Sequence, residues 1–162
     1  MYPAPYADLI DRFSSERGLD PRFLLSIMRQ ESRFDPLAHS GAAARGLMQF
    51  IGSTSGRVAL ELGRPAPSAD ELYSPATSIL FGARYLNDLF QMFPGQPQAV
   101  AAAYNGGEDN MTRWLARSRA QTADLYVPEI QYGQSKEYVM RVMANYHIYQ
   151  MLLDEHLQPM KR

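Results

Sequence analysis

The sequence predicts a single all-α domain over residues 1–162, and three observations carry this prediction. Apolar residues recur three and four positions apart along most of the chain, which is the spacing of amphipathic helices. Asp20-Pro21 and Ser74-Pro75 each combine a favoured N-cap residue with proline in the first turn of a helix. No stretch shows the alternation of apolar and polar residues that is typical of a half-buried strand.

Seven helices are expected, and each has its own sequence signal. In chain order they cover residues 5–17, 21–34, 53–62, 75–90, 98–104, 110–115 and 135–151. Gly18 ends the first helix, and the second stops before Pro36 because a residue that precedes proline avoids the helical region. Ser53 or Thr54 is expected to cap the third helix, and the prolines in residues 64–67 end it.

The second half of the chain is divided in the same way. The fourth helix follows Ser74 and carries a long apolar stripe, and the Ala-rich fifth helix stops at residues 105–107, Asn-Gly-Gly. Asn110 and Ser135 are the expected N-caps of the last two helices. Residues 120–133 are expected to form a loop.

The composition excludes several classes of function. With 16 basic and 17 acidic side chains, the net charge of -1 gives no electrostatic footprint for nucleic acid or an anionic membrane. There is no cysteine, and the three histidines lack metal-ligand spacing, so we expect no metal and no cofactor. No apolar run approaches the length of a membrane span, and residues 1–5 do not read as a signal peptide.

Glu31 stands where a carboxylate is not expected. It follows Leu24, Ile27 and Met28 by seven, four and three residues, so it falls on the stripe of the second helix that faces the core. Desolvation among apolar side chains disfavours the charged carboxylate and raises its pKa, which is what a general acid near neutral pH requires. The alternative is a Glu at the edge of the stripe that reaches water or pairs with Arg29 or Arg45.

Three loop segments carry polar or small residues in unusual combinations, over residues 41–49, 103–107 and 129–134. Small residues in the first allow close approach of a ligand to the backbone, and the second places a phenol and an amide at a helix end. Each has a structural alternative: Gly46 as a simple turn, Asn105-Gly106 as an ordinary helix stop, and Tyr104 as a core residue.

Taken together, Arg29-Gln-Glu-Ser32, Ser40 with Gly46-Leu-Met-Gln49, and Ala103-Tyr-Asn105 resemble the lytic transglycosylases of the soluble, goose-lysozyme-related type. The resemblance covers nearly all of the chain. It implies a lysozyme-like helical domain with a substrate cleft, which cleaves peptidoglycan glycan strands between N-acetylmuramic acid and N-acetylglucosamine and leaves a 1,6-anhydromuramyl end. It also implies a periplasmic or secreted location, and as partners a flanking helical domain or cell-wall assembly proteins.

Carried over by residue, the resemblance assigns Glu31 as the catalytic acid and base and Ser32 as its partner at the next helical position. Ser40 matches a serine that lies near the acetamido group of the muramyl residue. We expect a hydrogen bond from Tyr104 to the ionised Glu31, which would lower the pKa that burial raises.

The remaining matches are substrate-binding positions. Met48 and Gln49 match residues of the cleft, and Tyr104 and Asn105 match a pair that borders the catalytic carboxyl. Before the last helix the sequence departs from the family pattern: Glu129 stands one place later than the family's glutamate, and Gln134-Ser-Lys136 replaces Glu-Thr-Arg.

Two other functions compete with this interpretation. A goose-type lysozyme would use water in place of the sugar's 6-hydroxyl as the nucleophile, and its product would be one water heavier. A peptidoglycan-binding module would keep the cleft and lose turnover, an idea that the altered segment Gln134-Ser-Lys136 supports.

Overall fold

The helix starts expected at Asp20 and Ser74 are present in the computed structural model, which describes residues 1–118, 127, 130 and 133–161. The Asp20 carboxylate accepts a hydrogen bond from the backbone N–H of Arg22 at 2.9 Å, and the Ser74 hydroxyl accepts one from Thr77 at 3.5 Å. Each of these bonds satisfies a backbone donor that the first turn of a helix leaves without a partner.

The described residues form α-helices and one short 3-10 helix, without a named strand, so the predicted all-α class is confirmed. In chain order the elements are α1 (Ala7–Ser15), α2 (Pro21–Ser32), α3 (Gly52–Glu61), η1 (Glu71–Tyr73), α4 (Pro75–Met92), α5 (Pro97–Gly106), α6 (Glu108–Ser118) and α8 (Gly133–Leu152). Within the described part of the chain, no helix combines the length and apolar character that crossing a membrane demands.

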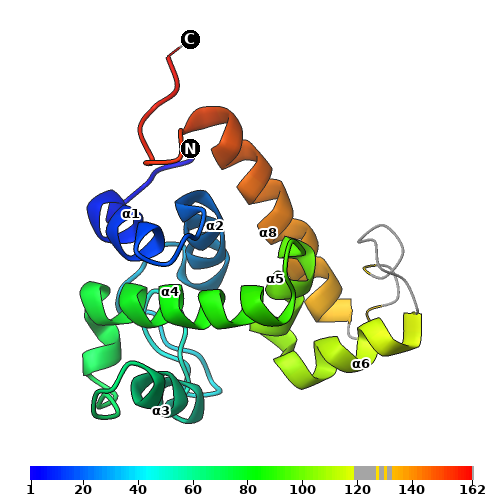
Figure 1. The fold of residues 1–162 in the computed structure, drawn as a ribbon. Helices are drawn as coiled ribbons and strands as arrows, with labels where there is room; N and C mark the ends of the chain where they lie inside the picture. The colour runs from blue at the N-terminus through cyan, green and yellow to red at the C-terminus, as the bar shows by residue number, and fades with distance from the viewer. Residues whose placement is uncertain (119–126, 128–129, 131–132, 162) are drawn as a thin grey trace.

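The long helices α4 and α8 organise the molecule. In Figure 1, α4 crosses the domain with α1 and α2 on one side and α3 on the other. Helix α8 packs against both α2 and α5. The N-terminal segment lies beside the C-terminal part of α8, where the Tyr149 hydroxyl donates a hydrogen bond to the carbonyl of Pro3 at 2.9 Å.

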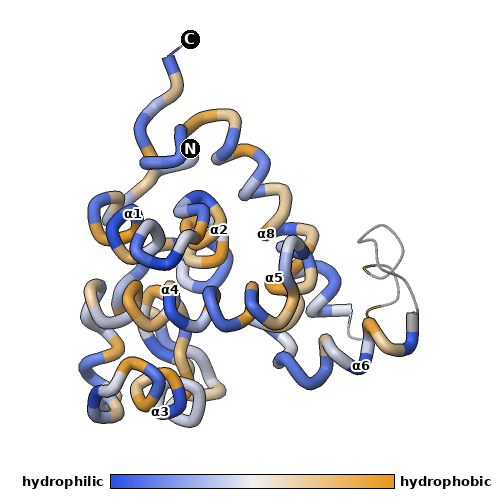
Figure 2. Tube along the Cα trace, viewed as in Figure 1, coloured by the Kyte–Doolittle hydropathy of each residue, from blue (hydrophilic) through white to orange (hydrophobic). Residues whose placement is uncertain are grey.

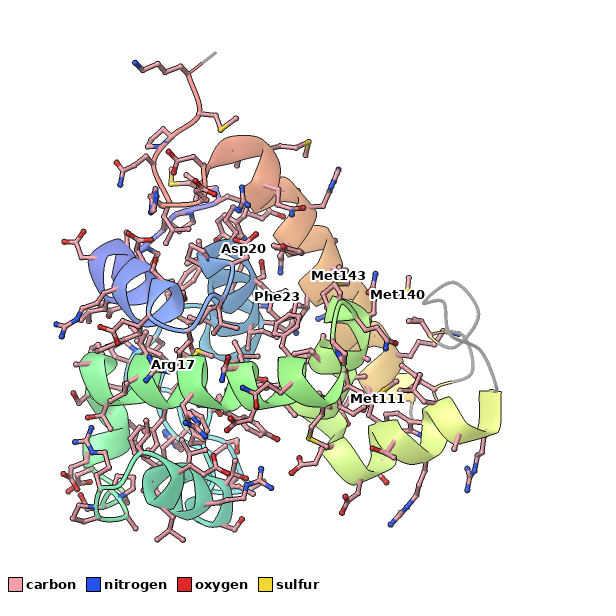
Figure 3. The ribbon with its side chains drawn as sticks, viewed as in Figure 1. Arg17, Asp20, Phe23, Met111, Met140 and Met143 are labelled. Carbon is pink, nitrogen blue, oxygen red and sulfur yellow. The ribbon has the colours of Figure 1, made fainter. Side chains whose placement is uncertain are left out.

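Apolar and polar segments alternate along the helices (Figure 2), and the apolar faces meet in one core. Phe23 on α2, labelled in Figure 3, contacts two of the neighbouring helices. Its ring lies edge-on to Phe90 of α4 and Tyr146 of α8, with centroids 5.2 and 5.3 Å apart. This packing fixes α2 between the two long helices, and α2 is the helix that bears Glu31.

Three of the expected N-caps are wrong. Helix α3 begins at Gly52, before Ser53, and has no side-chain cap. Helices α6 and α8 begin two residues before Asn110 and Ser135. The Asn110 amide instead donates to the Gly106 carbonyl at 2.7 Å, and the Ser135 hydroxyl donates to Asn105 Oδ1 at 2.9 Å. Asn110 thus bonds four residues back to the last residue of α5, and Ser135 bonds a residue of α5 that lies 30 positions earlier, so neither side chain caps its own helix.

Candidate active site

A cavity of about 400 Å³ opens between the end of α2, the loop that follows it, α4, α5 and the start of α8. Twelve residues line it: Glu31, Ser40, Ala42, Ala44, Gln49, Phe50, Ile51, Thr54, Tyr85, Tyr104, Asn105 and Gln134. Five of the eight site residues expected from the sequence are therefore together in one place. Glu31 is the one acidic residue among those that line the cavity.

Glu31 reaches this cavity from the last turn of α2. The stripe predicted from Leu24, Ile27 and Met28 is fully buried, and Glu31 continues it to the point where the core opens into the cavity. The hydroxyl of Tyr138 on α8 donates a hydrogen bond to Glu31 Oε1 at 2.6 Å.

The surroundings of Glu31 raise the pKa of its carboxyl group from 4.5 to about 7. Burial is the larger cause, because an ionised carboxylate loses its hydration there. The hydrogen bond from Tyr138 stabilises the ionised form and lowers the pKa in part. The group therefore holds a proton near neutral pH and is also able to release it, the two states that an acid and base need.

The expected hydrogen bond from Tyr104 to Glu31 is wrong. The Tyr104 hydroxyl donates instead to the backbone carbonyl of Met48 at 2.7 Å, and its ring packs against Tyr85 with centroids 5.3 Å apart. Burial, together with the nearby charge of Glu31, raises the pKa of Tyr104 well above its ordinary value, so the phenol stays neutral. Tyr104 thus fixes the loop that follows α2 against α5 and forms one wall of the cavity.

The loop that follows α2 is folded by its own polar groups. Gln49 Nε2 donates to the carbonyls of Ala38 and Gly46 at 3.1 and 3.0 Å, which draws the two sides of the loop together. Ser40 Oγ accepts a hydrogen bond from the Ala44 N–H at 3.1 Å. At Gly46 the backbone φ of +79° and the carbonyl of Leu72 leave no room for a Cβ.

Two expected site residues have other surroundings. Ser32 is nearly buried, and its hydroxyl donates to the Met28 carbonyl at 3.2 Å and accepts from the Phe34 N–H at 3.1 Å. Met48 is fully buried and packs against Gly82 of α4. Neither lines the cavity. The remaining expected site residue, Glu129, lies outside the described residues.

Two tyrosines of this site were not among the residues expected from the sequence. Tyr138 falls in the last predicted helix, residues 135–151, and no site role was predicted for it, yet it is the partner of Glu31. Tyr85 lines the cavity and donates to Glu108 Oε2 at 3.0 Å, and Glu108 in turn pairs with Arg57. Both tyrosines fall on helical core stripes, so the sequence alone does not separate them from ordinary packing residues.

The described residues contain no group of three or more His, Asp or Glu side chains placed to hold a metal ion. What the cavity offers is a buried carboxyl group, with a pKa raised to about 7, at the wall of a space that a ligand can enter. Backbone and amide groups from the loop and from α5 surround that space.

Comparison with known proteins places this chain in a family. Residues 8–127 match the family model described as the transglycosylase SLT domain. A relative from Haemophilus influenzae is 34% identical over 151 residues, which are 93% of this chain and 26% of the relative. The Escherichia coli protein named soluble lytic murein transglycosylase is 31% identical over 145 residues, 88% of this chain and 22% of that protein.

A solved structure gives the same result. An inactive glutamate-to-glutamine mutant of the lytic transglycosylase Slt from Pseudomonas aeruginosa superposes with a TM-score of 0.87 and 31% identity. The match covers 98% of this chain and 26% of that one. The predicted lysozyme-like class of fold is therefore confirmed, and the chain spans about a quarter of the length of the relatives that it matches.

Proposed function

Because the chain belongs to the transglycosylase SLT family, we propose that it is a lytic transglycosylase domain that cleaves peptidoglycan glycan strands. The bond cleaved joins N-acetylmuramic acid to N-acetylglucosamine. The observation that carries the proposal is the buried Glu31 at the cavity wall, hydrogen-bonded by Tyr138 at 2.6 Å and with a pKa raised to about 7. The name of the Escherichia coli relative supports murein as the substrate class.

In the first step Glu31 acts as a general acid. Its proton passes to the glycosidic oxygen as the bond from the muramyl C1 to that oxygen breaks, and the N-acetylglucosamine end leaves as an alcohol. The acetamido carbonyl of the muramyl residue stabilises the positive charge that develops at C1. As the proton leaves, the bond from Tyr138 becomes stronger because its acceptor becomes ionised.

In the second step the same carboxylate acts as a base. It takes the proton from the muramyl 6-hydroxyl, whose oxygen attacks C1 and closes a 1,6-anhydro ring, so Glu31 ends protonated as it began. The nucleophile is tethered to the reacting centre, and tethering replaces the entropic cost of capturing a second molecule. No water is consumed.

A single carboxylate supports this route over ordinary hydrolysis. Glycosidases that use water place a second carboxylate about 5 Å from the acid when they retain configuration and about 6.5–9.5 Å when they invert it. Among the described residues that line the cavity, Glu31 has no such companion. A goose-type lysozyme is the alternative, and a product one water heavier than the anhydro end would identify it.

The test is digestion of purified sacculi by the wild type, by Glu31→Gln and by Glu155→Gln, an exposed surface control. Mass analysis of the soluble products should give anhydro ends for the wild type and the control. In Glu31→Gln, loss of the general acid should lower the rate of glycan cleavage about 10²–10⁴-fold or more. Comparable turnover by folded Glu31→Gln would refute the assignment, and binding to sacculi without any release by the wild type would favour a non-catalytic binding module.

Murein lies outside the cytoplasmic membrane, so the proposal includes a periplasmic or secreted location. The chain spans about a quarter of the length of its relatives, and a flanking helical domain is therefore proposed as a partner in the whole protein.

A further inference from the structure

Two hydroxyl groups on one face of α8 each donate a hydrogen bond to a residue of the proposed active site. Tyr138 donates to Glu31, and Ser135, three positions earlier, donates to Asn105 Oδ1 at 2.9 Å. Residues three positions apart share a face of a helix, and both donors are buried, with 4% of Ser135 and 6% of Tyr138 exposed. Both acceptors line the active-site cavity. One face of α8 thus holds a residue of α2 and a residue of α5 in place.

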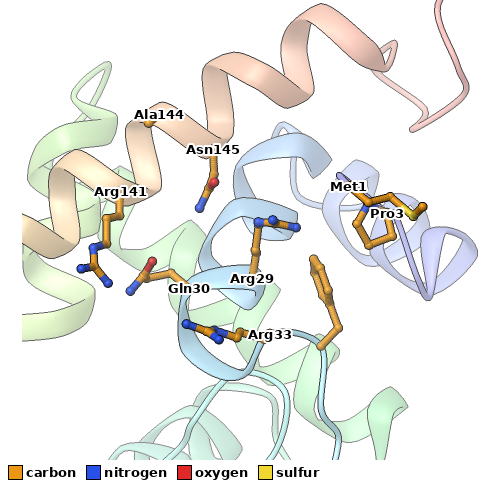
Figure 4. Close-up of a pocket in the computed structure, with 9 residues that line it drawn as sticks. Met1, Pro3, Arg29, Gln30, Arg33, Arg141, Ala144 and Asn145 are labelled. Carbon is orange, nitrogen blue, oxygen red and sulfur yellow. The ribbon is translucent and has the colours of Figure 1, made fainter.

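Other residues of α8 serve a separate space. Figure 4 shows Arg141, Ala144 and Asn145 of α8 beside a second cavity, of about 560 Å³, which lies between α8, α2 and the N-terminal segment. Ser135 and Tyr138 do not line that cavity, and the two cavities have no lining residue in common. The two buried hydroxyls therefore belong to the proposed active site.

Asn105 is held at its oxygen and is free at its nitrogen. It lies in the last turn of α5, is exposed, and lines the cavity. The bond from Ser135 is the one hydrogen bond of its side chain among the described residues. A side-chain amide has two N–H donors on its nitrogen. With the oxygen bound on the side of α8, these donors remain for a ligand in the cavity.

The hydroxyl of Ser135 lies in a close-packed place between α8, α5 and α6. A Cβ added at Gly106 would be 3.1 Å from Ser135 Oγ and 3.0 Å from Cη2 of Trp114, so a glycine at this position lets α8 approach the end of α5. The carbonyl of Gly106 also accepts a hydrogen bond from Asn110 Nδ2 at 2.7 Å. Packing on these sides fixes the donor that in turn fixes Asn105.

We propose that Ser135 is a positioning residue of the active site, which acts through Asn105. It holds the amide oxygen of Asn105, so that the amide nitrogen donates a hydrogen bond to an oxygen of the glycan strand. The inference rests on the proposed function and deepens it. The amide carries no charge, so the oxygen that it contacts belongs to a neutral group, a sugar hydroxyl or an acetamido carbonyl.

The kinetic test uses soluble glycan strands without peptides. Ser135→Ala removes the donor, and KM should rise about threefold to tenfold, the value of one neutral hydrogen bond. The kcat should change little, because the contact is the same before and during the reaction. Ser135→Thr keeps a hydroxyl and should recover most of the loss. The control is Ser26→Ala, a buried serine of α2 outside the cavity, whose hydroxyl donates to the Arg22 carbonyl at 2.7 Å.

A double-mutant cycle tests whether Ser135 acts through Asn105. Asn105→Ala should also raise KM, and adding Ser135→Ala should then have no further effect. Independent, additive losses would overturn the proposal. The pH–rate profile of Ser135→Ala should coincide with that of the wild type, because burial and Tyr138 are the causes of the shifted pKa of Glu31. A moved profile would show that Ser135 acts through Glu31 and would equally overturn the proposal.

A binding measurement separates this inference from the proposed reaction. In the Glu31→Gln background, Ser135→Ala should raise the Kd for the same strands about threefold to tenfold. The NMR signal of the Asn105 side-chain amide, identified by its loss in Asn105→Ala, should shift when strands are added. If the wild type cleaves nothing, the proposed function fails, and the change in Kd still decides the role of Ser135. An unchanged Kd in folded Ser135→Ala would overturn the inference even in an active enzyme.

Discussion

Replacing Glu31 by Gln should stabilise the protein above neutral pH while it removes the proposed reaction. The pKa of the carboxyl is raised from 4.5 to about 7 in the folded chain, so between these values the folded state binds more protons than the unfolded state. The free energy of unfolding of the wild type must therefore fall as pH rises through this window. Gln has nearly the same shape, carries no charge and still accepts the hydrogen bond from Tyr138.

The size of the effect follows from the shift. A difference of one pKa unit corresponds to 1.36 kcal/mol. The rise from 4.5 to about 7 therefore means that, above neutral pH, ionised Glu31 lowers the free energy of unfolding by about 3 kcal/mol. Glu31→Gln should be nearly neutral at pH 4, where Glu31 is protonated in both states. At pH 8 it should unfold with a free energy about 2–3 kcal/mol higher than that of the wild type.

The measurement is urea unfolding of both proteins at half-unit steps from pH 4 to pH 8. Glu155→Gln, which removes an exposed carboxyl, should change the unfolding free energy by less than about 0.5 kcal/mol at each pH. A difference between Glu31→Gln and the wild type that stays constant across the range would show that Glu31 is ordinarily hydrated, and the argument for a protonated acid would fail.

Two other substitutions test the surroundings of the site. Tyr138→Phe removes the one hydrogen bond that lowers the pKa of Glu31. Because a bond to a charged group contributes about 1.5–3 kcal/mol, the alkaline limb of the pH–rate profile should move up by about one to two units, and an unmoved limb would contradict the pairing. Gly46→Ala places a Cβ 2.0 Å from the Leu72 carbonyl at a φ of +79° and should cost several kcal/mol. Gly41→Ala, with nothing within 4 Å, is its control, and equal melting temperatures for the two would refute the steric argument.

The parts of the fold that the sequence predicted are those set by neighbouring residues. Asp20 and Ser74 begin their helices because a capping side chain reaches a backbone N–H two or three residues away. The position of Glu31 on the core stripe follows from helical period, and its raised pKa follows from that position. These inferences do not depend on which element packs against the helix.

The errors concern partners from distant segments. Ser135 was predicted to cap a helix, but its hydroxyl donates a hydrogen bond to Asn105, which lies 30 residues earlier. Tyr104 was expected to bond Glu31, whereas the folded loop presents the carbonyl of Met48 to it. The sequence does not indicate which acceptor a tyrosine on an apolar stripe bonds. The hydrogen bond from Tyr138 to Glu31 is therefore seen only in the structure.

The hydrogen bond between Tyr138 and Glu31 joins residues 107 positions apart. A shift of α8 by about 1 Å would carry the phenol beyond bonding distance and leave the carboxyl without its donor. The acidity of a carboxyl group on α2 is thus adjusted by a phenol on α8, against the larger effect of burial. A displacement of α8 that breaks this bond while Glu31 stays buried would raise the pKa of the carboxyl further, without any change in the residue itself.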